Sequence, residues 1–230
     1  MKTQLAALAQ NGELRAAINT GNRALVQQQS DGTLTGVSPA LARRLASEIG
    51  AELETVVYAG AGKVFADAGQ GRWDVGFLAI DPMRAQKVAF TDPYIVIEAT
   101  FAVRADAEYL RDVGDIDATG VSVLTATGSA YDMHLTKTLK HATLERSGTP
   151  PDSFAAFAAG QCDAVAGVRA SLEGYFADDP SVRILSGVLT EVRQAMVLPH
   201  HDAVAIAALN EFVARAVSDG FVAAHSAAQE

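Results

Sequence analysis

Cysteine is almost absent from this sequence: Cys162 is the only one among 230 residues, so no disulfide can form within the chain. Long apolar runs are also absent, and none approaches the roughly 18 residues that a membrane-spanning helix needs. Basic residues are outnumbered by acidic ones, 18 to 27, and the net charge of −9 opposes binding to nucleic-acid phosphates. We therefore expect neither a membrane span nor a nucleic-acid partner, and we expect Cys162 to be a small buried apolar residue.

The sequence patterns of metal and nucleophile sites are missing too. His134 and His141 lie two helical turns apart, too far for the i,i+4 chelation seen in helical zinc sites, and His200 and His201 are adjacent. Ser129 lacks the GxSxG context of a nucleophilic serine, and "GAGKVF" lacks the spacing of a phosphate-binding loop. We expect no metal, no cofactor and no catalytic residue.

What the chain does contain is a regular alternation of strand-like and helix-like runs, beginning with "LRAAIN", "SPALARRLASEIG" and "ETVVYA". This alternation is typical of βαβ units and predicts an α/β fold with a largely parallel sheet. Ser38 is predicted to cap a helix with Pro39 at its first position, and Gly50 is predicted to end that helix.

The two halves of the chain echo one another. "AGQGRWDVGFLA" and "FAAGQCDAVAGVRA" each place a glycine, Gly71 or Gly160, at a helix end three residues before an aspartate that opens an apolar strand. The strands lead to Arg84, one turn into an apparent helix, and to Arg169. Both arginines thus come just past the carboxyl end of a strand, where ligands bind in open α/β sheets.

This echo predicts two similar lobes. The extended runs 94–106 and 190–202 are the expected crossings between them, and together they would form a two-strand hinge. The helical pattern "DAVAIAALNEFVARAVSDGF" would return the chain to the first lobe. We expect lobe 1 to comprise residues 1–103 and 194–230, and lobe 2 to comprise residues 104–193.

Three motifs resemble the type II periplasmic solute-binding proteins of ABC transporters, family 3, the polar amino-acid class. They are "DGTLTGVSPALARRLASEIGAELE", "GRWDVGFLAIDPMRAQKVAFTDPY" and, typical of a divergent sub-branch, "GSAYDMHLTKTLKHA". The resemblance spans about residues 12 to 222. It implies two α/β lobes that close on a small ligand without making or breaking a bond. It also implies a periplasmic location, although "MKTQLAALAQNGELRAA" lacks the apolar core of a secretory signal, which leaves a cytoplasmic location open.

The resemblance assigns roles to several residues. It places Arg84 where the family grips a ligand carboxylate, and a guanidinium matches a carboxylate bidentately. The alternative is a surface arginine paired with Asp81 or Asp92. Ser129 opens a predicted helix in "GSAYD", so Ser129 and the backbone N–H of Ala130 would share the carboxylate with Arg84.

The chain departs from the family pattern near this site. Phe77 and Ala79 stand where the family has hydroxyl residues, and Val168, followed by Arg169, stands where it has the aspartate for the ligand's ammonium group. Glu98, in the crossing run, is the residue that could replace that negative charge. These departures favour an anion over an ordinary α-amino acid.

Asn22, Lys63 and Phe77 are also candidate ligand contacts. Asn22 stands where the family has an aromatic residue; it would contact a small or polar ligand or serve only a turn. Lys63 follows a glycine near a strand end and would be a third cation or an ordinary solvated lysine. Phe77 is either a wall of the ligand site or core.

The sequence thus predicts a monomeric, non-enzymatic binding protein for a small carboxylate ligand, with an ABC permease as partner. Two alternatives stay open: a dehydratase-like enzyme on the same scaffold, using Glu98 or Glu173 as an acid, and a stand-alone ligand-sensing domain.

Overall fold

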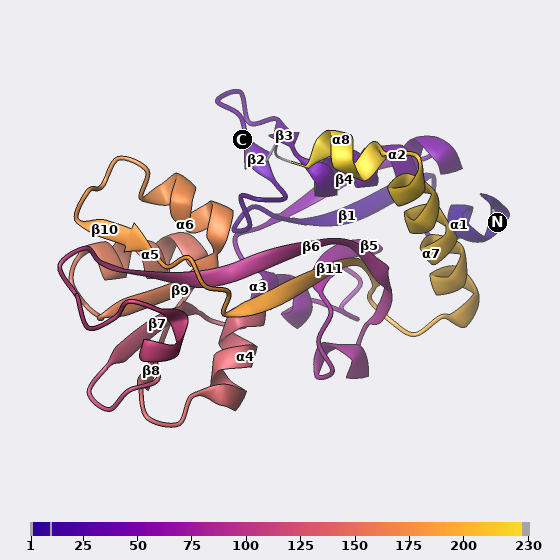
Figure 1. The fold of residues 1–230 in the computed structure, drawn as a ribbon. Coiled ribbons are helices and arrows are strands. Elements are labelled where there is room, and N and C mark those ends of the chain that lie inside the picture. The colour runs from indigo at the N-terminus through magenta and orange to yellow at the C-terminus, as the bar shows by residue number, and fades with distance from the viewer. Residues whose placement is uncertain (1, 10, 227–230) are drawn as a thin grey trace. The chain divides into compact units, whose positions relative to one another are not determined.

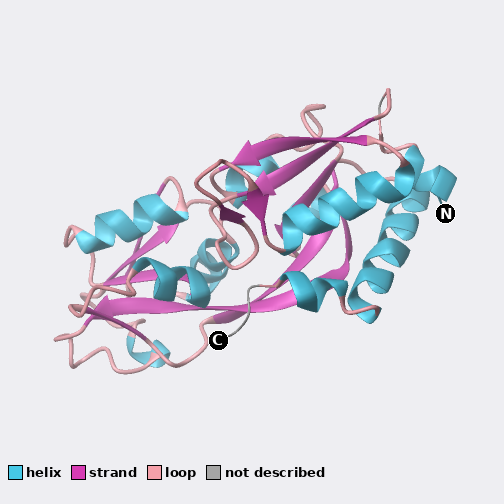
Figure 2. Cartoon of the chain, turned by 90° about the horizontal axis from the view of Figure 1, so that it is seen from above, coloured by secondary structure: helices cyan, strands magenta, loops and turns pink. Residues whose placement is uncertain are grey.

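The computed structural model describes residues 2–9 and 11–226, and the chain divides into two compact units (Figure 1). Unit 1 comprises Met1–Val96 and Arg193–Glu230, and unit 2 is the intervening Ile97–Val192. Strand β6 (Ala89–Arg104) carries the chain into unit 2 and strand β11 (Thr190–Leu198) carries it back. In each unit the helices flank the strands (Figure 2).

Unit 1 is built on a sheet with the strand order β4-β1-β5-β11. β1 lies parallel to both β4 and β5, whereas β11 runs antiparallel to β5. Its elements, besides part of β6, are α1 (Lys2–Ala6), β1 (Glu13–Asn19), β2 (Gln27–Gln28), β3 (Leu34–Thr35), α2 (Val37–Ile49), β4 (Glu52–Tyr58), α3 (Ala61–Ala66), β5 (Val75–Ala79), η1 (Arg84–Gln86), α7 (Ala203–Ser218) and α8 (Phe221–His225).

Unit 2 repeats this plan with the order β6-β9-β7-β8. β7 lies parallel to β8 and β9, and β6 runs antiparallel to β9 and β10. Its elements are η2 (Val113–Asp115), β7 (Ser122–Ala126), α4 (Ala130–Thr138), β8 (Thr143–Ser147), α5 (Pro150–Ala158), β9 (Ala164–Val168), α6 (Arg169–Tyr175) and β10 (Val182–Ile184).

Each unit has its own apolar core. In unit 1, Trp73, Val64 and Leu78 pack between α3 and the sheet, and Trp73 is 1% exposed. In unit 2, Phe154 and Phe157 of α5 pack on β7 and β9 together with Cys162. Cys162 is therefore the buried apolar residue that the sequence predicts, and burial raises the pKa of its thiol.

The echo between the two halves corresponds to one repeated hydrogen-bonding pattern. In unit 1, the carboxylate of Asp74 accepts the N–H of Arg15 (2.9 Å), and the N–H of Asp74 donates to the carbonyl of Arg15 (2.9 Å). In unit 2, Asp163 makes the same two contacts with Ser122, at 2.8 and 3.1 Å. Each aspartate therefore ties the start of its own strand to the start of the neighbouring parallel strand.

The two partners of these aspartates differ in kind. Arg15 also donates from Nε (3.0 Å) and Nη2 (2.6 Å) to Asp74, so the pair is bidentate and Asp74 is buried. Ser122 adds one hydroxyl donor at 2.6 Å to Asp163, a bond that lowers the pKa of this partly exposed carboxyl. The unit 1 junction is thus a charged pair and the unit 2 junction is not.

The glycines before these aspartates are only partly what the sequence predicts. Gly71 and Gly160 both have positive φ, 68° and 85°, as a left-handed turn requires. Gly160 directly follows the C-cap of α5, as predicted. Gly71 does not end a helix, because α3 has already stopped at Ala66 and a turn intervenes.

The start of α2 also differs from the prediction. The helix begins at Val37 with Gly36 as its N-cap, so Ser38 lies inside the first turn and does not cap it. Its buried hydroxyl lies 3.2 Å from the hydroxyl of Tyr94 instead. Gly50 ends the helix in the left-handed conformation, with φ 75°, as predicted.

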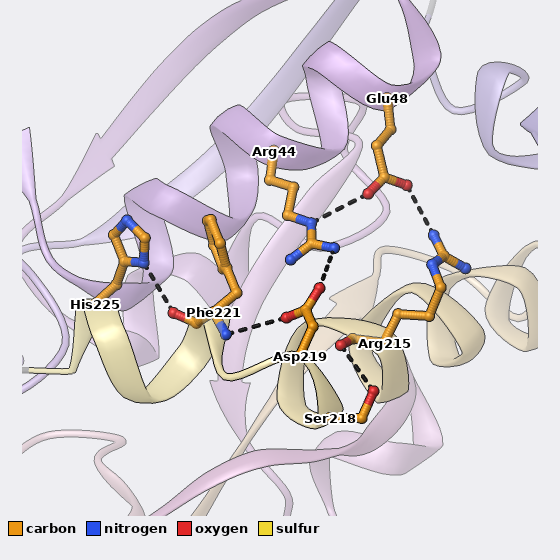
Figure 3. A network of polar contacts seen from close by, with 7 residues as sticks. All are labelled: Arg44, Glu48, Arg215, Ser218, Asp219, Phe221 and His225. Carbon is orange, nitrogen blue, oxygen red and sulfur yellow. Dashed lines mark hydrogen bonds and ion pairs between the residues drawn. The ribbon is translucent and has the colours of Figure 1, made fainter.

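The long C-terminal helix α7 belongs to unit 1 and is held against α2 by charged residues (Figure 3). Arg215 of α7 donates to Glu48 at 2.8 Å, and Arg44 of α2 bridges Glu48 (3.1 Å) and Asp219 (2.7 Å). The Arg44 guanidinium also lies 4.7 Å from the centroid of the Phe221 ring. This network ties α7 and α8 to α2.

No helix among the described residues has the length and apolar character needed to cross a membrane. Within residues 2–9 and 11–226, no three His, Cys, Asp or Glu side chains come together as a potential metal site.

Candidate functional site

Arg84 lies just past the carboxyl end of β5, at a turn made by Asp81. The Asp81 carboxylate accepts the N–H of Met83 (2.8 Å) and of Arg84 (3.3 Å), which stops the chain from continuing as a strand. Arg84 then begins a three-residue 3₁₀ turn, so the longer helix expected around it is not formed. The turn directs its side chain back, and Nη1 donates to the carbonyl of Ala79 at 3.0 Å.

Arg84 is also one of the most buried side chains, with 1% of its surface exposed. The alternative of a surface arginine is therefore wrong, although Asp81 is a neighbour of Arg84. Asp92 instead contacts Asn210. Burial lowers the pKa of Arg84 to about 10, and the charge of Asp81 partly opposes this. At neutral pH a buried cation therefore stands at the carboxyl edge of the unit 1 sheet.

The other unit 1 candidates differ in their position and exposure. Phe77 and Ala79 share one face of β5 and are 3% and 4% exposed; the Phe77 ring makes an edge contact with Tyr94 at 6.1 Å. Lys63 is an exposed residue of α3. The structure brings Ala79 into direct contact with Arg84, and the predicted ligand contacts of Phe77 and Lys63 stay predictions.

Asn22 follows β1 at the same edge and does serve a turn, because its carbonyl accepts the N–H groups of Leu25 (3.1 Å) and Val26 (3.0 Å). Its side chain is more unusual. Asn22 is 9% exposed, and its Oδ1 atom is buried without a hydrogen-bond partner among the described residues. A buried acceptor without a donor is costly, so this atom is suited to receive a donor from outside the chain.

In unit 2, the start of α4 has the predicted cap. The Ser129 hydroxyl accepts the N–H of Asp132 at 3.0 Å, and the Asp132 carboxylate reaches back to the N–H of Gly128 at 2.8 Å. The N–H groups of Ala130 and Tyr131 have no acceptor in the described part of the chain. The first turn of α4 thus presents two free donors and the positive end of a helix dipole.

Arg146 of β8 braces this turn, a contact that local sequence patterns do not reveal. Its Nε donates to the Asp132 carboxylate at 2.8 Å and its Nη2 donates to the Thr136 hydroxyl at 2.8 Å. Asp132 would otherwise place a negative charge beside the free N–H groups of α4. Arg146 therefore both balances that charge and fixes the orientation of the turn.

We expect Arg146→Gln to weaken binding of a carboxylate solute by roughly tenfold, since the charge of Asp132 is no longer balanced. Asp132→Asn removes that charge, so the double variant Asp132→Asn/Arg146→Gln should bind more tightly than Arg146→Gln alone. Isothermal titration calorimetry on the three variants measures this. A double variant that binds no better than Arg146→Gln would contradict charge balance as the cause.

Arg169 and Glu98 form an ion pair within unit 2. Arg169 Nε donates to Glu98 at 3.0 Å, and its other nitrogens donate to the carbonyls of Leu185, Ser186 and Gly187 at 2.9 to 3.0 Å. Arg169 therefore ties the start of α6 to the loop before β11. Glu98 is exposed, but its charge is balanced by Arg169, and ligand contacts by either residue stay predictions.

Comparisons with known proteins identify the family. The sequence matches the family described as bacterial extracellular solute-binding proteins, family 3, over residues 9–227. The chain belongs to this family.

The relatives of this family 3 solute-binding protein agree with that assignment. A glutamine-binding protein of Geobacillus stearothermophilus is 30% identical over 111 residues, which cover 48% of this chain and less than half, 42%, of that relative. The substrate-binding protein AbpA of an amino acid ABC transporter from Streptococcus pneumoniae, solved with L-arginine, superposes with a TM-score of 0.81 at 20% identity (93% and 92% of the two chains).

An ancestral amino-acid-binding protein, a precursor of cyclohexadienyl dehydratase, superposes equally well on this family 3 protein. Its TM-score is 0.81 at 21% identity, covering 96% of each chain. Likenesses at this level of identity show the fold, and the α/β fold of two-lobed periplasmic binding proteins expected from the sequence is confirmed.

Proposed function

We propose that this family 3 protein binds a small solute through its carboxylate, with Arg84 and the first turn of α4 as the groups that hold it. The observation that carries the proposal is Arg84 itself, a cation with 1% exposure at the carboxyl edge of a parallel sheet. The fork of an arginine matches the two oxygens of a carboxylate. The free N–H groups of Ala130 and Tyr131 suit the same anion.

The two contacts come from different units, so the proposal includes closure of two lobes on the ligand. Lobe 1 would comprise residues 1–103 and 194–230 and lobe 2 residues 104–193, with β6 and β11 as the hinge. Only a closed form would let one carboxylate touch both Arg84 and α4, so ligand would shift an equilibrium between open and closed forms. Asn22, Phe77 and Lys63 would line the lobe 1 side.

The physiological role that follows is delivery of this solute, by a monomeric periplasmic protein, to an ABC permease. The names of the relatives support this setting, since they describe binding of glutamine or arginine and an amino acid ABC transporter. The proposal extends this to a carboxylate-bearing solute of an amino-acid-like or organic-anion kind.

Two measurements test the proposal on the purified wild-type protein. Mass spectrometry of the small molecules released on denaturation should show a carboxylate that copurifies. Small-angle X-ray scattering of ligand-free and ligand-saturated protein should then show a smaller radius of gyration with ligand. Binding of that carboxylate with an unchanged radius would contradict lobe closure, and release of only uncharged molecules would contradict the carboxylate assignment.

Turnover distinguishes the enzymatic alternative from binding. A dehydratase needs an acid at the reacting group, but Glu98 is paired with Arg169 and Glu173 is an exposed residue of α6. Neither glutamate therefore has the surroundings expected of a catalytic acid. A ligand that is recovered unchanged after prolonged incubation supports binding, and conversion of that ligand would establish the enzyme.

A further inference from the structure

The charged residues at the carboxyl edges of the two sheets indicate what the ligand lacks. Parallel strands β1, β4, β5, β7, β8 and β9 end at these edges, and the six residues that follow each strand supply the side chains nearest to them. After β1 and β4 these residues include no carboxylate. The four others contribute one each: Asp81, Asp132, Asp152 and Glu173.

Three of these four carboxylates already have donors within the protein. Asp81 accepts two backbone N–H groups and lies beside the cation of Arg84. Asp132 accepts from Gly128 and Arg146. Asp152 accepts the Thr149 hydroxyl at 2.6 Å, at the start of α5. Glu173 is the exception, and it is exposed in the second turn of α6.

The end of β9 adjoins β7 and therefore the start of α4. Val168, the last residue of β9, is buried and offers no polar side-chain atom there. The next residue is Arg169, and the nearby Glu98 is already paired with it. This part of the edge therefore carries a balanced ion pair and an apolar residue, with no spare negative charge.

We infer that the protein selects carboxylates that lack an α-ammonium group; this inference rests on the proposed function. An ammonium group carries three donors and a positive charge, and burying that charge without a carboxylate to pair with it is costly. The side-chain oxygens that are buried without a partner in the described part of the chain, at or near these edges, are Oδ1 of Asn22 and the hydroxyls of Thr125, Tyr131, Ser147 and Ser171. None of these atoms carries a negative charge. Neutral acceptors suit a hydroxyl or amide of the ligand, but they leave the positive charge of a buried ammonium uncompensated.

The first test compares matched ligands on wild-type protein freed of copurified molecules by unfolding and refolding. Each common α-amino acid is paired with its 2-hydroxy and its deaminated counterpart, for example L-glutamate with 2-hydroxyglutarate and glutarate. Thermal-shift screening finds the pairs that bind, because a ligand of the native state raises its melting temperature, and calorimetry gives their Kd values. The amine-free member should bind at least about tenfold more tightly than its amino acid.

The outcomes separate the inference from the proposed function. An amino acid that binds more tightly than its amine-free counterparts overturns the inference and leaves carboxylate binding standing. If that preference disappears in Glu173→Gln, the missing carboxylate is Glu173. A complete absence of binding by both sets contradicts the proposed function and the inference together.

Val168 allows a gain-of-function test. Val168 is the N-cap of α6 in an extended conformation, and it makes no side-chain cap. Asp and Asn are both favoured at this position, so neither variant should disrupt the helix start. Val168→Asp supplies the missing charge and should shift the preference toward the amino acid by about tenfold or more, whereas Val168→Asn should not. An unchanged preference in Val168→Asp overturns the assignment of the missing carboxylate to this edge.

Discussion

Arg84→Ala is expected to weaken binding of a carboxylate solute by at least about a hundredfold, or roughly 3 kcal/mol. The variant removes a desolvated charged hydrogen-bond donor and leaves the ligand's own charge without a partner. Calorimetry should be done with the carboxylate that stabilises the wild-type protein most in the thermal-shift panel. A variant that binds within about twofold of wild type would show that Arg84 does not hold the ligand.

Two controls separate ligand binding from folding. Arg84→Lys keeps the charge but loses the planar fork, so its affinity should fall between those of wild type and Arg84→Ala. Arg111→Ala removes an exposed arginine outside the strand ends and should leave affinity unchanged. Because Arg84 also bonds to Ala79, circular dichroism must show that Arg84→Ala is folded before its affinity is interpreted.

Asp74→Ala is expected to lower the stability of unit 1 by about 3 kcal/mol. It strands the charge of Arg15, whose side chain is 22% exposed, and removes the acceptor of a backbone N–H. For a chain of this size the melting temperature should fall by roughly 6–12 °C. Differential scanning calorimetry gives the shift, and hydrogen exchange read by mass spectrometry shows whether the loss of protection is confined to unit 1.

Asp163→Ala is the matched control in unit 2. Asp163 occupies the equivalent place but accepts from Ser122 and not from an arginine, so no charge is stranded when it is removed. The loss of stability caused by Asp163→Ala should be about half that caused by Asp74→Ala or less. Equal effects would show that the shared strand junction, and not the charged pair, determines the stability of unit 1.

Much of the architecture could be predicted because local patterns encode it. The alternation of elements gave the α/β class, and the Ser129 cap, the Gly50 stop and the C-terminal helix all depend on residues close in sequence. The helix cap predicted at Ser38 was wrong, and the cause is again a residue close in sequence. Gly36 can adopt φ 99°, so the chain turns two residues earlier and frees Ser38 to contact Tyr94.

The charged pairs of the candidate site could not be read in this way. Arg146 reaches Asp132 because the register of β7 and β8 places Arg146 opposite Thr125, near the start of α4, and a pairing register is not visible in either strand alone. Arg169 likewise meets Glu98 across the pairing of β6 with β9. The sequence identifies the charged residues but does not show which of them form ion pairs with one another. The inference about the ligand depends on those ion pairs.

The path of the chain through the two units also bears on how the protein is synthesised. Unit 2 is one continuous segment, and the N–H of Leu189 donates to the carbonyl of Ala99 at 2.8 Å, so its incoming and outgoing ends run side by side. Unit 1 instead needs β11, whose residues pair with β5, and α7, and both are synthesised after nearly all of unit 2. Unit 2 should therefore fold on the nascent chain before β11 is available to pair with the earlier strands of unit 1. The part of unit 1 that precedes unit 2 in the chain is then the part that stays longest without the rest of its own fold.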